Sequence, residues 1–367
     1  MRKGWVELLN KHDKLSPEGG TVHSLVGLFS LKIQCILLSH CGTDPAKHHC
    51  GLYFQAKEIR NHSWLDGVNI MAIKLSIIIP TRNRAGIIQT LLDSIRELVG
   101  LDRFQPQIIV GDNNSQDETW KLLHTIAKNF PLPLTLLKVK KRGKSAVMNE
   151  ASRAARGDVL AFLDDDVVVQ PNWLCAVQQF FQEKEYQAAQ GVIRIRPPRT
   201  ENREIHTLIN RYRTIPNVDF GPDIEHFHSL NGANFAVSRQ ALNRVGPFDE
   251  RLGPGASGTS EDVEFARRLR REGFRIGYMR EAVVYHSIDP IRLTEDYFKT
   301  HHKRQGHSRV LMNDKGIGRI FFNLGRATAQ FAFYSLGKSE RDRYRSKGRI
   351  YHYLGMLETK LKNRNSV

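Results

Sequence analysis

Three adjacent carboxylates, Asp164, Asp165 and Asp166, are the residues whose type and spacing point most directly to chemistry. They follow residues 158–163, which form an apolar run typical of a buried strand. Neighbouring carboxylates destabilise a fold unless a cation or hydrogen-bond donors offset their charge. Carboxylate ligands suit Mg²⁺ or Mn²⁺ held together with substrate phosphates. The alternative is an acidic loop that faces water or caps a helix near 172–183, and the preceding strand favours the metal–diphosphate site.

The elements that must position these carboxylates alternate between strand and helix. Strands are expected at 75–79, 107–111, 134–139 and 158–163, and helices at 87–98, 118–129 and 144–155. This order predicts an α/β fold with a mostly parallel, Rossmann-like sheet and helices on both of its faces. Ligands of such sheets bind beyond the carboxyl ends of the strands, where the loops 80–84, 112–117 and 164–166 fall. Later strands at 188–196, 233–237, 274–278 and 282–286, with a helix at 261–272, are expected to complete a pocket over the edge of the sheet.

The positive charge of the chain is concentrated at its end. The 367 residues carry a net charge of +17, and residues 299–367 contribute 16 basic and 4 acidic side chains. Such a tail predicts an anionic partner, either a membrane surface, a polyanionic substrate or nucleic acid, unless it is only a solvated helical surface. Nucleic acid is disfavoured because no groove-reading motif or aromatic stacking platform is present. The mean hydropathy of −0.42 argues against a protein with many membrane spans.

The first 70 residues are the least informative part of the chain. Four cysteines do not make a disulfide framework, which favours a reducing, cytosolic setting. The Cys and His residues at 35–50 lack the CxxC spacing of zinc sites, and the apolar segment 24–38 is too interrupted to span a membrane. A strand begins soon after Met71, so we expect Met71 to be the natural start and residues 1–70 to be a poorly defined extension.

Two nucleotide-binding motifs are excluded. The segment Gly143-Lys144-Ser145 resembles the end of a P-loop, but the earlier glycine of that motif would fall at Lys138. No GxGxxG follows the first strand, which disfavours a dinucleotide-dependent oxidoreductase.

Seven short motifs occur in the order typical of one enzyme family. They are Ser76-Ile-Ile-Ile-Pro-Thr-Arg-Asn-Arg84, Val110-Gly-Asp-Asn-Asn-Ser-Gln-Asp-Glu-Thr119, Gly143-Lys-Ser-Ala-Val-Met-Asn149, Phe162-Leu-Asp-Asp-Asp166, Asn231-Gly-Ala-Asn234, Gly246-Pro-Phe-Asp-Glu250 and Glu261-Asp262. Residues 74–290 therefore resemble a family 2 glycosyltransferase with the GT-A fold. The resemblance implies inverting transfer of a sugar from a nucleotide-diphosphate donor to an acceptor hydroxyl, as in a hexosyltransferase, assisted by Mn²⁺ or Mg²⁺. The product would be a surface polysaccharide or a glycolipid, and the acceptor a saccharide or lipid-linked molecule.

The resemblance also implies roles for individual residues. Pro80, Thr81 and Asn83 would line the nucleoside pocket, and Asp112 would accept a hydrogen bond from the base. Asp164 would lie towards the ribose with Asp165 beside it in the donor site, whereas Asp166 would bind the metal. Lys144, like Arg142, would add a charged contact to the donor or remain solvated. His286 ends a predicted strand where some relatives supply a further metal ligand, and whether it does so here is left open.

Asp262 is the candidate catalytic base. On a helix opening near Ser260 it shares a face with Ala266 and Leu269, so we expect its side chain to point inward. A helix N-terminus stabilises a carboxylate, so we expect Asp262 to be ionised and only weakly basic. The alternative is that Glu261 and Asp262 merely complement the helix dipole. Residues 253–258 contain three glycines and would either close over the donor or serve as a flexible connection.

The chain is thus expected to comprise an extension (1–70), a GT-A catalytic domain (71–298) and a basic helical extension (299–367). Residues 316–336 mix apolar side chains with Arg319 and Arg326 and precede a Lys- and Arg-rich stretch. They would form a helix lying at an anionic membrane interface or packed on the catalytic domain. We therefore expect a cytoplasmic protein, peripheral on the inner face of the cell membrane if the tail binds lipid. A non-catalytic protein that binds nucleotide sugar or membrane is the alternative, which the intact set Asp112, Asp164, Asp166 and Asp262 disfavours.

Overall fold

A computed structural model describes residues 72–183, 185–196, 202–221, 223–312, 316–337 and 339–364. The expectations for Met71, for the extension 1–70 and for its Cys–His cluster lie outside the described residues. The strands are β1 (Leu75–Thr81), β2 (Gln107–Asp112), β3 (Leu134–Lys138), β4 (Val159–Leu163), β5 (Val167–Val169), β6 (Ala188–Ile195), β7 (His226–Phe227), β8 (Asn234–Ser238) and β9 (Ile276–His286). The helices are α4 (Ile88–Arg96), α5 (Leu101–Phe104), α6 (Thr119–Lys128), α7 (Lys144–Ala154), α8 (Trp173–Glu183), α9 (Arg203–Tyr212), α10 (Arg239–Val245), α11 (Glu261–Arg271), the 3₁₀ helix η2 (Pro290–Leu293), α12 (Glu295–Met312), α13 (Ile317–Leu336) and α14 (Glu340–Arg364).

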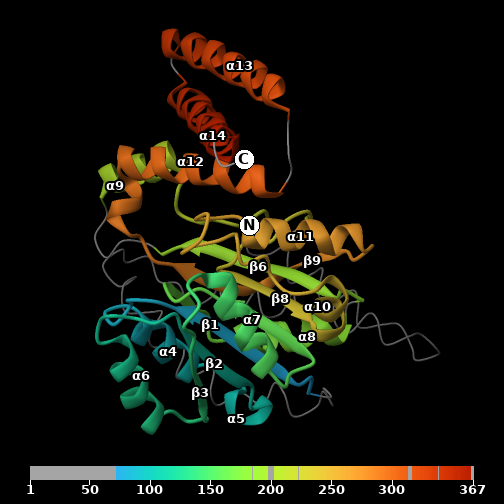
Figure 1. The fold of residues 1–367 in the computed structure, drawn as a ribbon. Helices are drawn as coiled ribbons and strands as arrows, with labels where there is room; N and C mark the ends of the chain where they lie inside the picture. The colour runs from blue at the N-terminus through green and yellow to red at the C-terminus, as the bar shows by residue number, and fades with distance from the viewer. Residues whose placement is uncertain are drawn as a thin grey trace, which may run out of the picture. The chain divides into compact units, whose positions relative to one another are not determined.

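The central strand β1 is buried along its whole length because helices cover both faces of the sheet. Successive side chains of a strand point to opposite faces. Ile77 and Ile79 accordingly join the core cluster that includes Leu91 of α4 and Trp173 of α8. Ile78 joins the opposite cluster, which includes Met148 of α7 and Phe265 of α11. The predicted α/β fold class, with helices on both faces of the sheet, is confirmed (Figure 1).

The sheet runs in the order β3-β2-β1-β4-β8-β6-β9-β5, with β7 paired to β9. The half formed by β3, β2, β1 and β4 is parallel, as the alternation of strand and helix predicted. β8 then pairs antiparallel with both β4 and β6, so the second half is mixed. The ends of β1 and β4 meet at one edge, which brings the loop after Thr81 next to Asp164–Asp166.

The expected strands 274–278 and 282–286 are one strand. β9 is continuous from Ile276 to His286, and its pairing with β6 shifts register between Gly191 and Val192. The break expected between residues 278 and 282 contains the exposed Arg280 and Glu281, which occupy this irregularity in the pairing. The continuous strand fixes His286 at its end, opposite Val167 of β5.

Three helices, α12, α13 and α14, end the described chain (Figure 1). α14 packs against α12, α13 and α9, and α12 also contacts η2. The domain boundary expected between residues 298 and 299 falls inside α12. No helix among the described residues is long and apolar enough to cross a membrane.

Candidate active site

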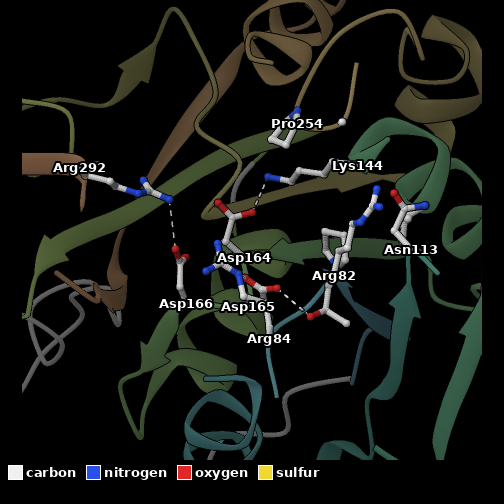
Figure 2. Close-up of a pocket in the computed structure, with 13 residues that line it drawn as sticks. Arg82, Arg84, Asn113, Lys144, Asp164, Asp165, Asp166, Pro254 and Arg292 are labelled. Carbon is white, nitrogen blue, oxygen red and sulfur yellow. Dashed lines mark hydrogen bonds and ion pairs between the residues drawn. The ribbon is translucent and has the colours of Figure 1, made fainter. Parts of the chain in front are cut away.

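A pocket of about 270 Å³ opens at the carboxyl ends of β1 and β4 (Figure 2). Its lining combines the three consecutive aspartates with four basic side chains, two residues of the 253–258 loop and the end of β1. The lining residues are Pro80, Thr81, Arg82, Arg84, Asn113, Lys144, Val147, Asp164, Asp165, Asp166, Pro254, Gly255 and Arg292. Of the predicted donor-site residues, Pro80, Thr81, Lys144, Asp164 and Asp165 therefore lie together at this pocket.

Lys144 joins Asp164 to the start of α11. Its ammonium group donates to the Asp164 carboxylate and lies 3.4 Å from Oε1 of Glu261. Burial disfavours the charge of Lys144, but the two carboxylates outweigh it and raise the pKa of this lysine. Burial likewise opposes ionisation of Asp164, but the nearby Lys144 lowers the pKa of that carboxyl. The pair is therefore ionised, and Lys144 is not a solvated side chain.

Asp165 is held by the end of β1. Its Oδ2 accepts a hydrogen bond of 2.7 Å from the Thr81 hydroxyl, and its Oδ1 lies 3.5 Å from Nε of Arg84. Burial raises the pKa of Asp165 to about 7, with Arg84 opposing the shift and Asp166 adding to it. Asp165 thus turns towards the strand and Arg84, while its neighbours point elsewhere in the pocket (Figure 2).

Asp166 and His286 carry the donor atoms that would suit a metal. Asp166 Oδ2 accepts from Arg292 at 3.2 Å, whereas Oδ1 is buried without a hydrogen-bond partner. His286 Nδ1 lies 2.8 Å from the Ser287 carbonyl, which can only accept, so this nitrogen carries a proton, and in the neutral ring Nε2 then has a free lone pair. Nε2 lies 3.3 Å from the orphaned Oδ1 of Asp166. Two lone pairs facing each other so closely require a proton or a cation between them.

Asp166 Oδ1 and His286 Nε2 suit a divalent cation that takes its remaining ligands from the substrate. Two ligands of an octahedral ion at about 2.1 Å would lie about 3.0 Å apart, close to the Oδ1–Nε2 separation. Within the described part of the chain, no three His, Cys, Asp or Glu side chains gather as a metal-binding group. A cation here would need further oxygens, which substrate phosphates commonly supply.

Asp262 lies at the start of α11 and points inward, as its helical position predicted. Ala266 and Leu269 on the same face are buried. Asp262 Oδ2 accepts from the backbone N–H of Gly232 at 2.8 Å, and Oδ1 accepts from that of Val263 at 2.7 Å. Burial and the adjacent Glu261 raise the pKa of Asp262 to about 7, although Lys144 and the two N–H groups oppose this. The expectation that the helix N-terminus lowers the pKa of Asp262 is therefore wrong, because the effect of burial is larger and raises it.

Asp262 and the 164–166 turn belong to one polar cluster. A methyl group added at Gly232 would lie 2.6 Å from Nζ of Lys144 and 3.6 Å from Oδ2 of Asp262. The lysine, Asp262 and Glu261 therefore converge on Gly232, although Asp262 does not itself line the pocket. A side chain at position 232 would have to displace this ammonium group.

Asp112 and Asn83 do not line the pocket. The buried carboxylate of Asp112 accepts from both the N–H and the hydroxyl of Ser115. Asn83 is exposed with a left-handed backbone (φ 52°), and its Oδ1 accepts from the Gln116 N–H at 2.8 Å. Both side chains shape the loop after β2, and their expected contacts with a nucleoside stay predictions.

The glycine-rich loop covers one side of the pocket and is anchored at both ends. The Pro254 carbonyl accepts from the Lys144 N–H at 2.9 Å. Ser257 Oγ lies 2.7 Å from Ser308 Oγ of α12. Gly253, Gly255 and Gly258 all have positive φ, and an added methyl group at Gly255 would lie 3.0 Å from Cα of Gly143. Glycine at 255 thus lets the loop approach α7.

No role was assigned from the sequence to four polar side chains that line the pocket. Arg82 and Arg84 stand inside the first motif, and their charge was the signal available. Asn113 fixes the segment before α7 at the pocket, because its side chain accepts from the Gly143 N–H and donates to the Lys141 carbonyl. Arg292 comes from η2, far from any motif, and nothing in its surrounding sequence indicated a contact with Asp166.

The sequence is similar to known glycosyltransferases. The profile of Glycosyl transferase family 2 matches residues 76–246. Glycosyltransferase AglE of Haloferax volcanii is 23% identical over 249 residues, which span 67% of this chain and 77% of that protein. Chondroitin synthase of Escherichia coli is 26% identical over 59% of this chain but only 35% of its own length.

A solved structure supports the fold. The mannosyltransferase PcManGT from Pyrobaculum calidifontis, in complex with GDP-Man and Mn²⁺, aligns over 84% of this chain and 93% of its own, with a TM-score of 0.53 and 18% identity. At that identity the likeness establishes the architecture alone. The matched family domain contains Thr81, Lys144 and all three aspartates of the pocket. Residues 76–246 therefore form a domain of glycosyltransferase family 2, and the fold is GT-A.

Proposed function

We propose that this enzyme transfers a sugar from a nucleoside-diphosphate donor, with inversion and with help from Mn²⁺ or Mg²⁺, to a hydroxyl of a saccharide or lipid-linked acceptor. The observation that carries the proposal is the cluster of Asp164, Asp166, Lys144 and Asp262 beside a pocket at the strand ends. The Mn²⁺ and GDP-Man complex of the Pyrobaculum enzyme supports it. Similarity to chondroitin synthase and to poly-beta-1,6-N-acetyl-D-glucosamine synthase of Staphylococcus epidermidis supports a role in surface polysaccharide synthesis.

The basic side chains of the pocket would bind the diphosphate. Lys144 and Arg292 already form charged contacts with Asp164 and Asp166, and Arg82 lines the same space. Charge-assisted bonds from guanidinium and ammonium groups to phosphate oxygens are stronger than neutral ones. The nucleoside would lie against Pro80 and Thr81, with Asp164 and Asp165 on the donor side.

Asp166 and His286 would hold the divalent cation. When bound, the cation offsets the negative charge that develops on the departing nucleoside diphosphate. Arg292 fixes the second oxygen of Asp166, so that Oδ1 keeps its direction towards His286.

Asp262 would act as the general base. The acceptor oxygen forms a bond to the anomeric carbon from the face opposite the diphosphate, the carbon–oxygen bond to the diphosphate breaks, and the hydroxyl proton passes to Asp262. The N–H groups of Gly232 and Val263 fix the orientation of this carboxylate. A pKa of about 7 makes it a stronger base than an ordinary aspartate near neutral pH. The anchored 253–258 loop would limit access of water, which competes with the acceptor.

We also propose that α13 rests on an anionic membrane surface. Its buried residues Ile320 and Ala327 face the protein, whereas Phe322, Phe333 and Leu336 are exposed. An aromatic face near basic residues suits a helix at a lipid interface. Replacing Phe322 and Phe333 by serine should reduce sedimentation with phosphatidylglycerol vesicles, and unchanged sedimentation contradicts this placement.

The experiment that tests the enzymatic proposal is a panel of nucleotide sugars with candidate saccharide and lipid-linked acceptors, in Mn²⁺ or in EDTA. Released nucleoside diphosphate and the anomeric configuration of the product are measured. We expect release that needs both the acceptor and the cation, with inversion. Equal turnover in EDTA contradicts the metal, and a product that retains the configuration of the donor contradicts the single displacement.

A further inference from the structure

A second pocket, of about 590 Å³, lies between α9, α12 and α14. It shares no lining residue with the pocket at the carboxyl ends of β1 and β4, which we call the donor pocket. Its lining residues are mostly basic or aromatic: Arg211, Tyr212, Arg213, Phe298, His302, Gln305, Arg341, Tyr344, Arg345, Gly348, Arg349, His352 and Tyr353. Pockets of this size are typical of small-molecule sites.

The charge of this pocket is largely uncompensated. Five arginines line it, and no lining residue is acidic. Arg211 pairs with Glu340 at 3.0 Å. Arg213, Arg341 and Arg345 are exposed and make no ion pair with any residue that the structure describes. The donor pocket differs, because each of its aspartates has a cation beside it.

The spacing of the arginines on α14 costs stability in the absence of an anion. Arg341, Arg345 and Arg349 follow one another at intervals of four residues, so they share one face of the helix. Like charges at this spacing destabilise a helix. The nearest acid within a turn of Arg345, Asp342, accepts from the Ser339 hydroxyl at 2.6 Å. A bound anion would remove this repulsion.

The walls of the pocket are built by close packing. A methyl group added at Gly348 would lie 2.6 Å from Nε2 of His302, so glycine lets α14 approach α12. The His302 ring also packs edge-on to Phe298 at 4.5 Å, and its Nδ1 lies 3.1 Å from Oε1 of Gln305. Arg349 donates to Gln330 of α13 at 2.9 Å. The arginines therefore surround a hollow with fixed aromatic walls, which distinguishes it from a solvated basic face.

We propose that this pocket binds a phosphate or diphosphate group at a site separate from the donor pocket. Several guanidinium groups around one hollow match a multiply charged oxyanion, since each forms paired N–H bonds to phosphate oxygens. A single carboxylate would neutralise only one of the five arginines. The phosphate belongs either to a soluble phosphorylated molecule or to a lipid headgroup, and both present the same oxygens.

The test compares the wild type with R341Q/R345Q and with a matched control, R156Q/R271Q. The control removes two positive charges from exposed arginines that line neither pocket. Binding of inorganic pyrophosphate is measured by calorimetry without divalent metal. Any binding of pyrophosphate to the donor pocket is the same in all three proteins, because none of the changed residues lines it. We expect R341Q/R345Q to lose one binding event or to weaken it at least tenfold, and the control to match the wild type.

The second arm identifies the source of the phosphate. Sedimentation with phosphatidylcholine vesicles is compared with and without phosphatidic acid. A loss of pyrophosphate binding together with reduced sedimentation supports a lipid headgroup, and a loss of pyrophosphate binding alone supports a soluble ligand. Equal pyrophosphate binding by all three proteins overturns the proposal. It is also overturned if R341Q/R345Q loses only binding to a single-stranded RNA oligonucleotide, because the surface then binds nucleic acid.

Discussion

The donor pocket and the basic pocket between α9, α12 and α14 handle charge in opposite ways. In the donor pocket, Asp164, Asp165 and Asp166 each lie beside a basic side chain, so the protein itself offsets much of their charge before any substrate binds. In the basic pocket, Arg213, Arg341 and Arg345 make no ion pair with a described residue. Balanced clusters fix the geometry of a reaction centre, whereas unbalanced ones favour a ligand that supplies the missing charge.

The largest effect is expected from removing the Asp262 carboxylate beside the donor pocket. Asp262→Asn keeps the shape of the side chain but removes the basic carboxylate, so kcat should fall by about 10²- to 10⁴-fold. Donor affinity, measured by calorimetry, should stay within a few-fold, because Asp262 does not line the pocket. A loss of donor affinity as large as the loss of kcat would show that Asp262 supports binding instead.

A smaller effect on kcat/KM is expected when the pH is lowered. Because burial and Glu261 raise the pKa of Asp262 to about 7, this carboxyl is protonated below that pH and cannot accept a proton. The kcat/KM should therefore fall about tenfold for each unit below the pKa. The folded protein also binds this proton more readily than the unfolded chain, so the contribution of Asp262 to stability decreases as the pH rises from 3.8 to about 7.

Asp165 is the control for this profile, because burial also raises its pKa to about 7. The inflection in kcat/KM should persist in Asp165→Asn and disappear in Asp262→Asn. The opposite pattern would assign the titration to Asp165 and remove the support for Asp262 as the base.

The smallest effects are expected from glycine substitutions in the helices at and beside the basic pocket. Gly348→Ala places a methyl group 2.6 Å from His302, so it should lower the free energy of unfolding by about 1 kcal/mol or more. Gly325→Ala on α13 meets nothing within 4 Å and should instead raise it by up to about 1 kcal/mol, the helix preference for alanine. Thermal unfolding midpoints measure both, and an unchanged or raised midpoint for Gly348→Ala would contradict the close crossing of α12 and α14.

The sequence allowed prediction of the elements whose signals are contiguous. The alternation of apolar runs with helical segments predicted the parallel half of the sheet, and the polar loops after those runs predicted the place of the pocket. The inward face of Asp262 followed from helical spacing. These features depend on neighbouring residues, which a single chain displays directly.

The remaining features depend on residues that are far apart in the sequence. Antiparallel pairing of β8 between β4 and β6 follows from the packing of the whole sheet. The contact of Arg292 with Asp166 joins residues 126 positions apart. The basic tail was evident from composition, but a pocket formed with Arg211 and His302 needs α9 and α12 in place. The raised pKa of Asp262 likewise arises from burial that helical position alone does not reveal.

The loop at 253–258 has a consequence for how this enzyme can be divided. One end of the loop bonds to the start of α7, and Ser257 bonds to Ser308 of α12. The loop thus connects α12 to the wall of the pocket at the ends of β1 and β4. A truncation before α12 would remove the Ser308 partner and leave that end of the loop without its anchor, so a shortened enzyme should retain α12.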